Sequence, residues 1–259
     1  MFLDINGIRL NTVSFGCGKQ TFLAHGGFVG SWELWQQPFE LMSKRWHCVS
    51  YDHRGAGESH VPPESITKEA IVNDIFAVMD KLEIEKCILA GESMGGSIAI
   101  MAALQQPDRF SGLVLVDTGP PVLRPLTEET KQFIKLMETD FKTAMNRFVR
   151  GCINEPNSEH YIHWGLDICL RTKPEAAIRL ARLFEGNNEG DTEYPLSNIS
   201  VPTLVIHGSN DLMVPLDLAK YLKNNIPNAK LVVIDGAGHV PIMTYPYEVV
   251  EAIEQYFIP

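Results

Sequence analysis

Basic clusters and long apolar runs are both missing from this sequence. The 259 residues include 22 Lys and Arg against 32 Asp and Glu, which gives a formal net charge of -10. Such a surface repels a phosphate backbone, so we expect no nucleic-acid partner. No apolar run reaches the ~20 residues that span a bilayer, and no basic start followed by an apolar stretch indicates a signal peptide. These absences predict a cytoplasmic protein with no membrane partner.

Cysteine is also scarce, and the sequence shows no metal-binding pattern. The cysteines form neither a CxxC pair nor the Cys/His spacing of a zinc site, and there is no HxHxDH cluster. An odd number of unclustered cysteines is typical of buried thiols in a reducing compartment. We therefore expect free thiols and no metal site. The five cysteines are Cys17, Cys48, Cys87, Cys152 and Cys169.

What the sequence does contain is the composition of a globular protein, with 45% hydrophobic and 21% charged residues. Its length lies near the upper limit for one hydrophobic core, so we expect one domain that carries an insertion. The first ten residues alternate around Asn6-Gly7, a dipeptide that favours a type I′ turn, and this pattern predicts a β-hairpin.

Short apolar runs with β-branched residues predict the strands of a buried sheet. Two stretches with helical periodicity, 67–82 and 94–106, lie between these runs. Because strands and helices alternate, the predicted fold class is α/β, with a mostly parallel sheet covered by helices on both faces. The predicted strands are Thr21–Ala24, His47–Tyr51, Cys87–Ala90, Leu113–Val116, Thr203–Ile206 and Leu231–Ile234.

The alternation breaks between residues 119 and 201, where helical patterns follow one another. We interpret this segment as a helical cap inserted between the two parts of the core, 1–118 and 202–259. The polar stretch Asn187–Glu193 is expected to be a connector. The predicted helices of the insertion are Thr127–Val149, Ser158–Leu170 and Pro174–Phe184.

Gly91–Gly95 has the pattern Gly-X-Ser-X-Gly, which places a serine on a sharp turn between a strand and a helix. Chance alone supplies such a pattern fairly often, but here it follows the predicted strand Cys87–Ala90 and opens the helical stretch after Gly96. That context is the one in which a serine acts as a nucleophile. Ser93 is therefore the predicted nucleophile.

A serine hydroxyl needs a base, and the base needs an orienting acid. His239 is the predicted base, because it lies in a glycine-rich loop after the last predicted strand. Asp211 follows the strand Thr203–Ile206 and precedes His239, so it is the predicted acid. Asp117, at the end of the neighbouring strand, is a competing candidate for the same role.

Backbone N–H groups are needed to stabilise the negative charge that develops on a substrate carbonyl oxygen. Met94 supplies one donor by its position after the nucleophile. The loop after Thr21–Ala24 contains two adjacent glycines that let the backbone approach a substrate closely. Gly27 or Phe28 is the predicted second donor of this oxyanion hole.

Five segments in order make the chain similar to the α/β-hydrolase superfamily along nearly its whole length. They are His25–Gly27, Asp52–Ser59, Gly91–Gly96, Asp211 and His239. The resemblance implies an eight-stranded core sheet, a helical lid between strands six and seven, and no cofactor.

The segment Asp52–Ser59 matches a signature of that superfamily that is read as a structural loop after a strand. We therefore assign it no chemistry. Its His53 and Arg54 are expected at the surface of the protein.

The fold does not choose among the reactions of this superfamily, so the site residues must. Haloalkane dehalogenases and epoxide hydrolases resemble this chain but carry aspartate where it has Ser93. The predicted function is serine-dependent hydrolysis of small carboxylic esters through an acyl-enzyme. The alternative is a lactonase that acts on acyl-homoserine or enol lactones with the same triad. A carbon–carbon bond hydrolase and a non-catalytic ligand-binding protein fit less well.

Aromatic and Met side chains of the insertion are candidates for the wall of an acyl pocket. Phe141, Met145 and Trp164 are the predicted substrate-binding residues. Such residues at helical spacing also suit simple packing of the insertion onto the sheet, and that alternative stays open. The predicted partner is a small-molecule ester or lactone. The sequence leaves the oligomeric state open, and a homodimer is compatible with it.

Overall fold

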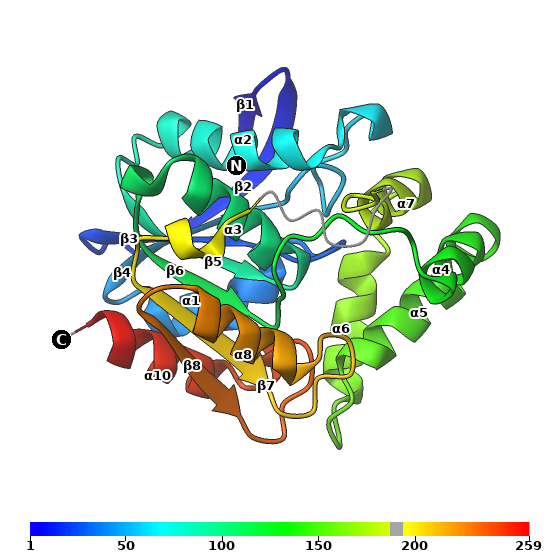
Figure 1. The fold of residues 1–259 in the computed structure, drawn as a ribbon. Helices are drawn as coiled ribbons and strands as arrows, with labels where there is room; N and C mark the ends of the chain where they lie inside the picture. The colour runs from blue at the N-terminus through cyan, green and yellow to red at the C-terminus, as the bar shows by residue number, and fades with distance from the viewer. Residues whose placement is uncertain (187–193, 259) are drawn as a thin grey trace.

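A computed structural model of the protein describes residues 1–186 and 194–258, and its centre is one eight-stranded sheet (Figure 1). The strand order is β1-β2-β4-β3-β5-β6-β7-β8. β1 and β2 form an antiparallel hairpin, β2 runs antiparallel to β4, and all other neighbours are parallel. The strands are β1 (Phe2–Ile5), β2 (Ile8–Phe15), β3 (Gln20–His25), β4 (Trp46–Tyr51), β5 (Cys87–Glu92), β6 (Phe110–Val116), β7 (Thr203–Gly208) and β8 (Ala229–Ile234).

The burial of the strands explains their sequence patterns. Every residue of β5 and β7 is buried, as expected for central strands of a parallel sheet with both faces covered. In β1, by contrast, exposed and buried residues alternate. Asn6 and Gly7 take φ angles of 49° and 80°, which are the angles of a type I′ turn. The predicted hairpin and the predicted α/β fold class are confirmed.

Helices pack on both faces of the sheet. α1 (Gln36–Met42) contacts α9 (Pro241–Thr244) and α10 (Pro246–Phe257), whereas α2 (Lys68–Lys81) contacts α3 (Met94–Gln105). α8 (Leu216–Asn225) packs on β7 and β8. Among residues 1–186 and 194–258, no helix combines the length and apolar composition that crossing a membrane requires.

In the described part of the segment between β6 and β7 lie four further α-helices, which we call the cap. They group together beside the sheet (Figure 1). α4 contacts both α5 and α7, and α5 contacts α6. The division of the chain into separate core and cap units stays a prediction, and the predicted connector Asn187–Glu193 lies outside the described residues. The cap helices are α4 (Glu128–Thr139), α5 (Phe141–Cys152), α6 (Glu159–Cys169) and α7 (Pro174–Ala181).

The prediction of one long helix over Thr127–Val149 is wrong, because the chain breaks at Asp140. This residue leaves the helical region, with φ -151° and ψ 80°, and its carboxylate accepts a hydrogen bond from the Thr143 N–H at 3.0 Å. Aspartate favours such capping positions over helix interiors. The apolar periodicity continues across the break, so it concealed the end of α4.

A buried ion pair fixes the loop after β4. Arg54 Nε lies 2.6 Å from Asp74 Oδ2, and Arg54 Nη2 lies 3.0 Å from Asp74 Oδ1. The two side chains are only 7% and 1% exposed. His53 is buried as well, so the expectation that His53 and Arg54 lie at the surface is wrong. Arg54 carries a charge, so its sequence position suggested an exposed side chain. Its partner Asp74 lies 20 residues away in α2, and the sequence does not show that the two side chains meet.

We expect Asp74→Ala to lower the free energy of unfolding by about 3–5 kcal/mol, because it leaves the Arg54 guanidinium buried without its partner. Urea unfolding measures the change. Asp80→Ala is the matched control, since Asp80 pairs with Arg109 but is 66% exposed, and its loss is expected to cost at most about 1 kcal/mol. Equal losses for the two variants would contradict the assignment.

Candidate active site

Ser93 stands on a strained turn between β5 and α3. Its φ of 51° and ψ of -123° belong to a region that residues other than glycine rarely adopt. The turn is also crowded. A Cβ on Gly91 would lie 2.2 Å from the carbonyl oxygen of Gly95, and one on Gly95 would lie 2.4 Å from that of Gly26. The flanking glycines are therefore a steric requirement of the turn that presents Ser93.

His239 connects Ser93 to Asp211. Its Nε2 lies 2.9 Å from Ser93 Oγ and its Nδ1 lies 2.8 Å from Asp211 Oδ2. The other carboxylate oxygen of Asp211 accepts hydrogen bonds from the N–H groups of Met213 and Val214, at 2.7 and 2.9 Å. Because β5, β7 and β8 run parallel, the loops after them meet at one edge of the sheet. The structure thus brings together three residues that span 146 positions of the sequence, from Ser93 to His239.

The contact between His239 and Asp211 raises the pKa of His239 and lowers the pKa of Asp211. Burial acts to lower the pKa of His239, but the hydrogen bond to Asp211 and the charges of Glu92 and Asp211 outweigh it and raise the pKa above 6.5. Burial acts to raise the pKa of Asp211, but the hydrogen bond and charge of His239 outweigh it, and the pKa is lowered. Asp211 is therefore an ionised acceptor that stabilises the imidazolium form of His239.

Asp117, the competing acid, lies beside Asp211 and bonds to the end of β7. Its Oδ1 accepts a hydrogen bond from the Gly208 N–H at 2.8 Å and lies 3.4 Å from His207 Nδ1. Within the described residues it makes no hydrogen bond to His239. Burial raises the pKa of Asp117 well above its usual value, and the charge of Asp211 adds to the rise. Asp117 thus connects the ends of β6 and β7, and its surroundings favour the protonated form of its carboxyl group.

Asp117, His207 and Asp211 are also the residues whose placement suits a metal ion. Each offers a ligand-type atom, and these atoms lie within 4.8 Å of one another. Hydrogen bonds within the protein already engage all three residues: Asp117 with Gly208, Asp211 with His239, and His207 Nε2 with the Val214 carbonyl at 3.0 Å. The chemistry of Ser93 and His239 does not call on such an ion.

The loop after β3 approaches Ser93 closely, and two histidines contact its backbone carbonyl groups. A Cβ on Gly27 would lie 3.2 Å from the Ser93 Cβ. His53 Nε2 lies 2.9 Å from the Gly27 carbonyl oxygen, and His25 Nδ1 lies 2.7 Å from that of Gly26. The two imidazole rings are stacked, with centroids 5.1 Å apart. Burial, with the nearby His53, lowers the pKa of His25 to about 3, so it stays neutral.

Glu92 is a site residue that the sequence analysis missed. Its side chain is 3% exposed, and Oε1 lies 3.7 Å from His239 Nε2. Burial raises the pKa of Glu92 to about 7, whereas His239 and a backbone hydrogen bond from Gly27 act to lower it. The available signal was its position directly before Ser93, at the variable residue of the Gly-X-Ser-X-Gly pattern, where a side chain lies close to the predicted nucleophile.

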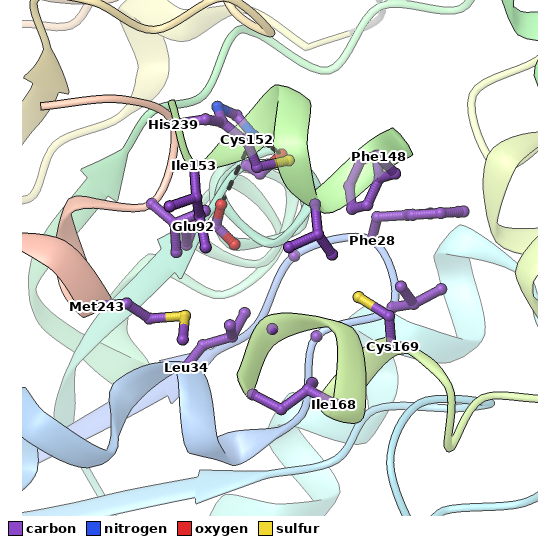
Figure 2. A pocket seen from close by; sticks show the side chains of 17 residues that line it. Phe28, Leu34, Glu92, Phe148, Cys152, Ile153, Ile168, Cys169, His239 and Met243 are labelled. Carbon is purple, nitrogen blue, oxygen red and sulfur yellow. Dashed lines mark hydrogen bonds and ion pairs between the residues drawn. The ribbon is translucent and has the colours of Figure 1, made fainter. Parts of the chain in front are cut away.

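A cavity opens beside Ser93 between the sheet and the cap (Figure 2). Its walls come from the loop after β3, from α5 and α6, and from the loop that carries His239. They are mostly apolar, and among them are Phe28, Leu34, Phe148, Ile153, Ile168 and Met243. A second hollow, the outer groove, lies on the other side of Phe28 and Phe148 and is lined by Met94, Phe133, Leu180 and Phe184.

The predicted substrate-binding residues do not line either hollow. Met145 is fully buried in the hydrophobic core, and Phe141 and Trp164 pack against that core. Their helices do reach the cavity, but through other residues, such as Phe148 of α5 and Ile168 of α6. The structure therefore supports packing as the role of these three side chains.

The cap is tied to the loop that carries His239. The Cys152 carbonyl, at the end of α5, accepts a hydrogen bond from the His239 N–H at 2.9 Å. Glu155 Oε1 accepts hydrogen bonds from the Gly238 N–H at 2.8 Å and from Thr244 Oγ1 at 2.7 Å. The backbone of the histidine loop is thus positioned by the cap as well as by β8.

Comparison with known proteins agrees with this architecture. A family model described as alpha/beta hydrolase fold matches residues 20–160 and 179–246. Pimeloyl-(acyl-carrier protein) methyl ester esterase from Nitrosomonas europaea is 27% identical over 247 residues, which cover 92% of this chain and 96% of that protein. Karrikin insensitive 2 receptor CA from Petunia hybrida is 24% identical over 257 residues, covering 94% and 93%.

A solved structure gives the same result for the fold. The enol-lactonase from Burkholderia xenovorans LB400 is 20% identical and covers 100% of both chains with a TM-score of 0.88. The sheet order and the turn at Ser93 define an α/β protein of the hydrolase class. Because the family model covers most of the chain, the protein belongs to the α/β-hydrolase family.

We expect the pKa of His239 to lie above 6.5 in solution, because Asp211 and Glu92 both stabilise its charged form. Glu92→Gln removes one of these negative charges and is expected to lower the pKa of His239. NMR titration of the imidazole measures both values, with His239→Gln identifying the signal. Glu138→Gln, an exposed cap position, is the control that leaves the pKa unchanged. A rise of the pKa in Glu92→Gln would contradict the geometry.

Proposed function

We propose that the protein hydrolyses small carboxylic esters, with Ser93 as nucleophile, His239 as general base and Asp211 as orienting acid. The observation that supports this most directly is the pair of His239 hydrogen bonds, 2.9 Å to Ser93 Oγ and 2.8 Å to Asp211 Oδ2. A serine on a strained turn with a base and an acid in this order is the arrangement that activates a hydroxyl for acyl transfer.

The proposed reaction has two halves. Ser93 Oγ attacks the ester carbonyl carbon while His239 Nε2 takes the hydroxyl proton. The tetrahedral intermediate then breaks the bond to the alcohol, which leaves with the proton from His239, and an acyl-enzyme remains. A water molecule attacks the acyl-enzyme and gives a proton to His239. The second intermediate releases the carboxylic acid, and His239 returns the proton to Ser93.

The oxyanion hole is proposed to consist of the Met94 and Phe28 N–H groups. Met94 is the first residue of α3, so its N–H lies at the N-terminus of the helix, where negative charge is stabilised. Between the two candidates for the second donor, the backbone hydrogen bond of Gly27 to Glu92 favours Phe28, because it engages Gly27 elsewhere.

A lactonase is the second candidate. A ring ester presents the same electrophilic carbonyl to Ser93, and the similar structure from Burkholderia xenovorans LB400 is named an enol-lactonase. The cavity has mostly apolar walls, as an acyl chain or a small ring requires. The relative from Petunia hybrida is named a receptor, so a ligand-binding role without turnover is the candidate from a different class.

We expect the wild-type protein to hydrolyse p-nitrophenyl butyrate and Ser93→Ala to lose at least about 10³-fold in kcat, because the nucleophile is gone. Release of p-nitrophenol measures the rate, and a fluorophosphonate label on Ser93 reports activation of the nucleophile independently. N-butanoyl homoserine lactone in the same assay distinguishes lactonase from esterase. Equal rates for wild type and Ser93→Ala would leave only the ligand-binding role.

Asp211→Asn is expected to lower kcat by about 10⁴-fold, because an amide does not hold the imidazole in the required tautomer or stabilise its charge. Asp117→Asn is the matched variant. Its amide oxygen keeps the bond to the Gly208 N–H, and the bond between His239 and Asp211 is untouched, so kcat is expected to stay within about tenfold. If Asp117→Asn were the more damaging change, the two roles would have to be exchanged.

A further inference from the structure

The cavity beside Ser93 contains one carboxyl group in otherwise apolar walls. Of the side chains that line it, only those of Glu92, Ser93 and His239 carry nitrogen or oxygen. Figure 2 shows the Glu92 carboxyl next to His239, with Phe28 and Phe148 farther along the same cavity. The reaction that we propose uses Ser93 and His239 but gives no task to Glu92.

Glu92 differs from Asp74, the buried acid that is paired with an arginine. Asp74 forms two short bonds to the guanidinium of Arg54. For Glu92, in the part of the chain that the structure describes, no lysine or arginine is within ion-pair distance. Its partners are the Gly27 backbone and His239, whose Nε2 is 3.7 Å away and already bonded to Ser93. A buried carboxylate with so few partners is a negative charge that the surrounding residues leave largely uncompensated.

We propose that Glu92 is an anionic subsite that binds a positively charged ammonium group of the substrate, on the half of the molecule that enters this cavity. The inference rests on the proposed function, because it identifies the substrate class of the same site. Phe28 and Phe148 support it, because aromatic faces also attract cations and these rings lie 5.3 Å apart at the cavity wall.

Binding of a cation at Glu92 is expected to change the rate of the reaction as well as the affinity for the substrate. A negative charge directly before Ser93 opposes the negative charge that develops on the substrate oxygen. An uncharged substrate does not neutralise the carboxylate, so the repulsion between the two negative charges remains. A cationic substrate neutralises the carboxylate, and the interaction that binds the cation also removes the penalty in the transition state. Glu92 is therefore expected to favour cationic over neutral substrates of equal shape.

The test compares two pairs of esters in which a trimethylammonium group replaces a tert-butyl group of the same shape. Acetylcholine and 3,3-dimethylbutyl acetate carry the change on the alcohol half. Ethyl trimethylammonioacetate and ethyl 3,3-dimethylbutanoate carry it on the acyl half. A pH-stat at pH 8, above the pKa of about 7 for Glu92, gives kcat/KM for wild type, Glu92→Gln and Glu138→Gln.

The quantity compared is the ratio of kcat/KM for the cationic ester to that for its neutral partner, because intrinsic reactivity cancels between enzymes. We expect the ratio to fall at least about tenfold in Glu92→Gln for one of the two pairs, which also identifies the half that enters the cavity. Glu138→Gln, with the same charge change on the exposed cap surface, keeps the wild-type ratio. Unchanged ratios for both pairs in Glu92→Gln would overturn the proposal.

An equilibrium measurement keeps the proposal testable without turnover. Calorimetric titration with choline and with 3,3-dimethylbutanol compares binding to wild type and to Glu92→Gln. Choline is expected to bind wild type at least about tenfold more tightly than the variant, with no such change for the alcohol. Equal choline binding refutes the subsite. Absence of hydrolysis and of Ser93 labelling refutes the proposed function instead, and the two failures are thus separate.

Discussion

The backbone turn at Ser93 is the constraint on which the rest of the site depends. The positive φ of Ser93 projects its hydroxyl from the edge of the sheet, and the turn closes only because Gly91 and Gly95 lack side chains. Parallel pairing of the strands on either side then delivers the acid and the histidine to the same edge. Local strain at one residue is therefore compensated by the packing of a whole sheet.

Three buried carboxyl groups, those of Asp211, Asp117 and Glu92, lie near one another at this edge of the sheet, and their surroundings give them different properties. Asp211 accepts two backbone N–H bonds and faces His239, so it stays ionised. Burial and the charge of Asp211 raise the pKa of Asp117 well above its usual value. Burial raises the pKa of Glu92 to about 7. The same functional group thus serves orientation, support of the fold and, by our proposal, recognition.

The sequence predicted the fold class, the hairpin and the order of the elements because these depend on local periodicity and on turn residues. It also named Ser93, Asp211 and His239, which the structure brings within hydrogen-bond distance. It failed where a residue's role depends on distant partners. Phe141 and Trp164 have the chemistry of a pocket wall but pack against the core. No periodicity reveals which side chain of a helix faces a cavity, because this depends on how the helix docks.

The hydrogen bonds that the His239 and Gly238 N–H groups donate to Cys152 and Glu155 hold the histidine loop against the cap. Lifting the end of α5 would pull on the His239 backbone and misalign the base. Substrate and product are therefore expected to pass along the outer groove, where Met94 and Phe184 lie, and not past the end of α5. If the proposed function is correct, a substrate that enters along this groove reaches Ser93 without displacing His239.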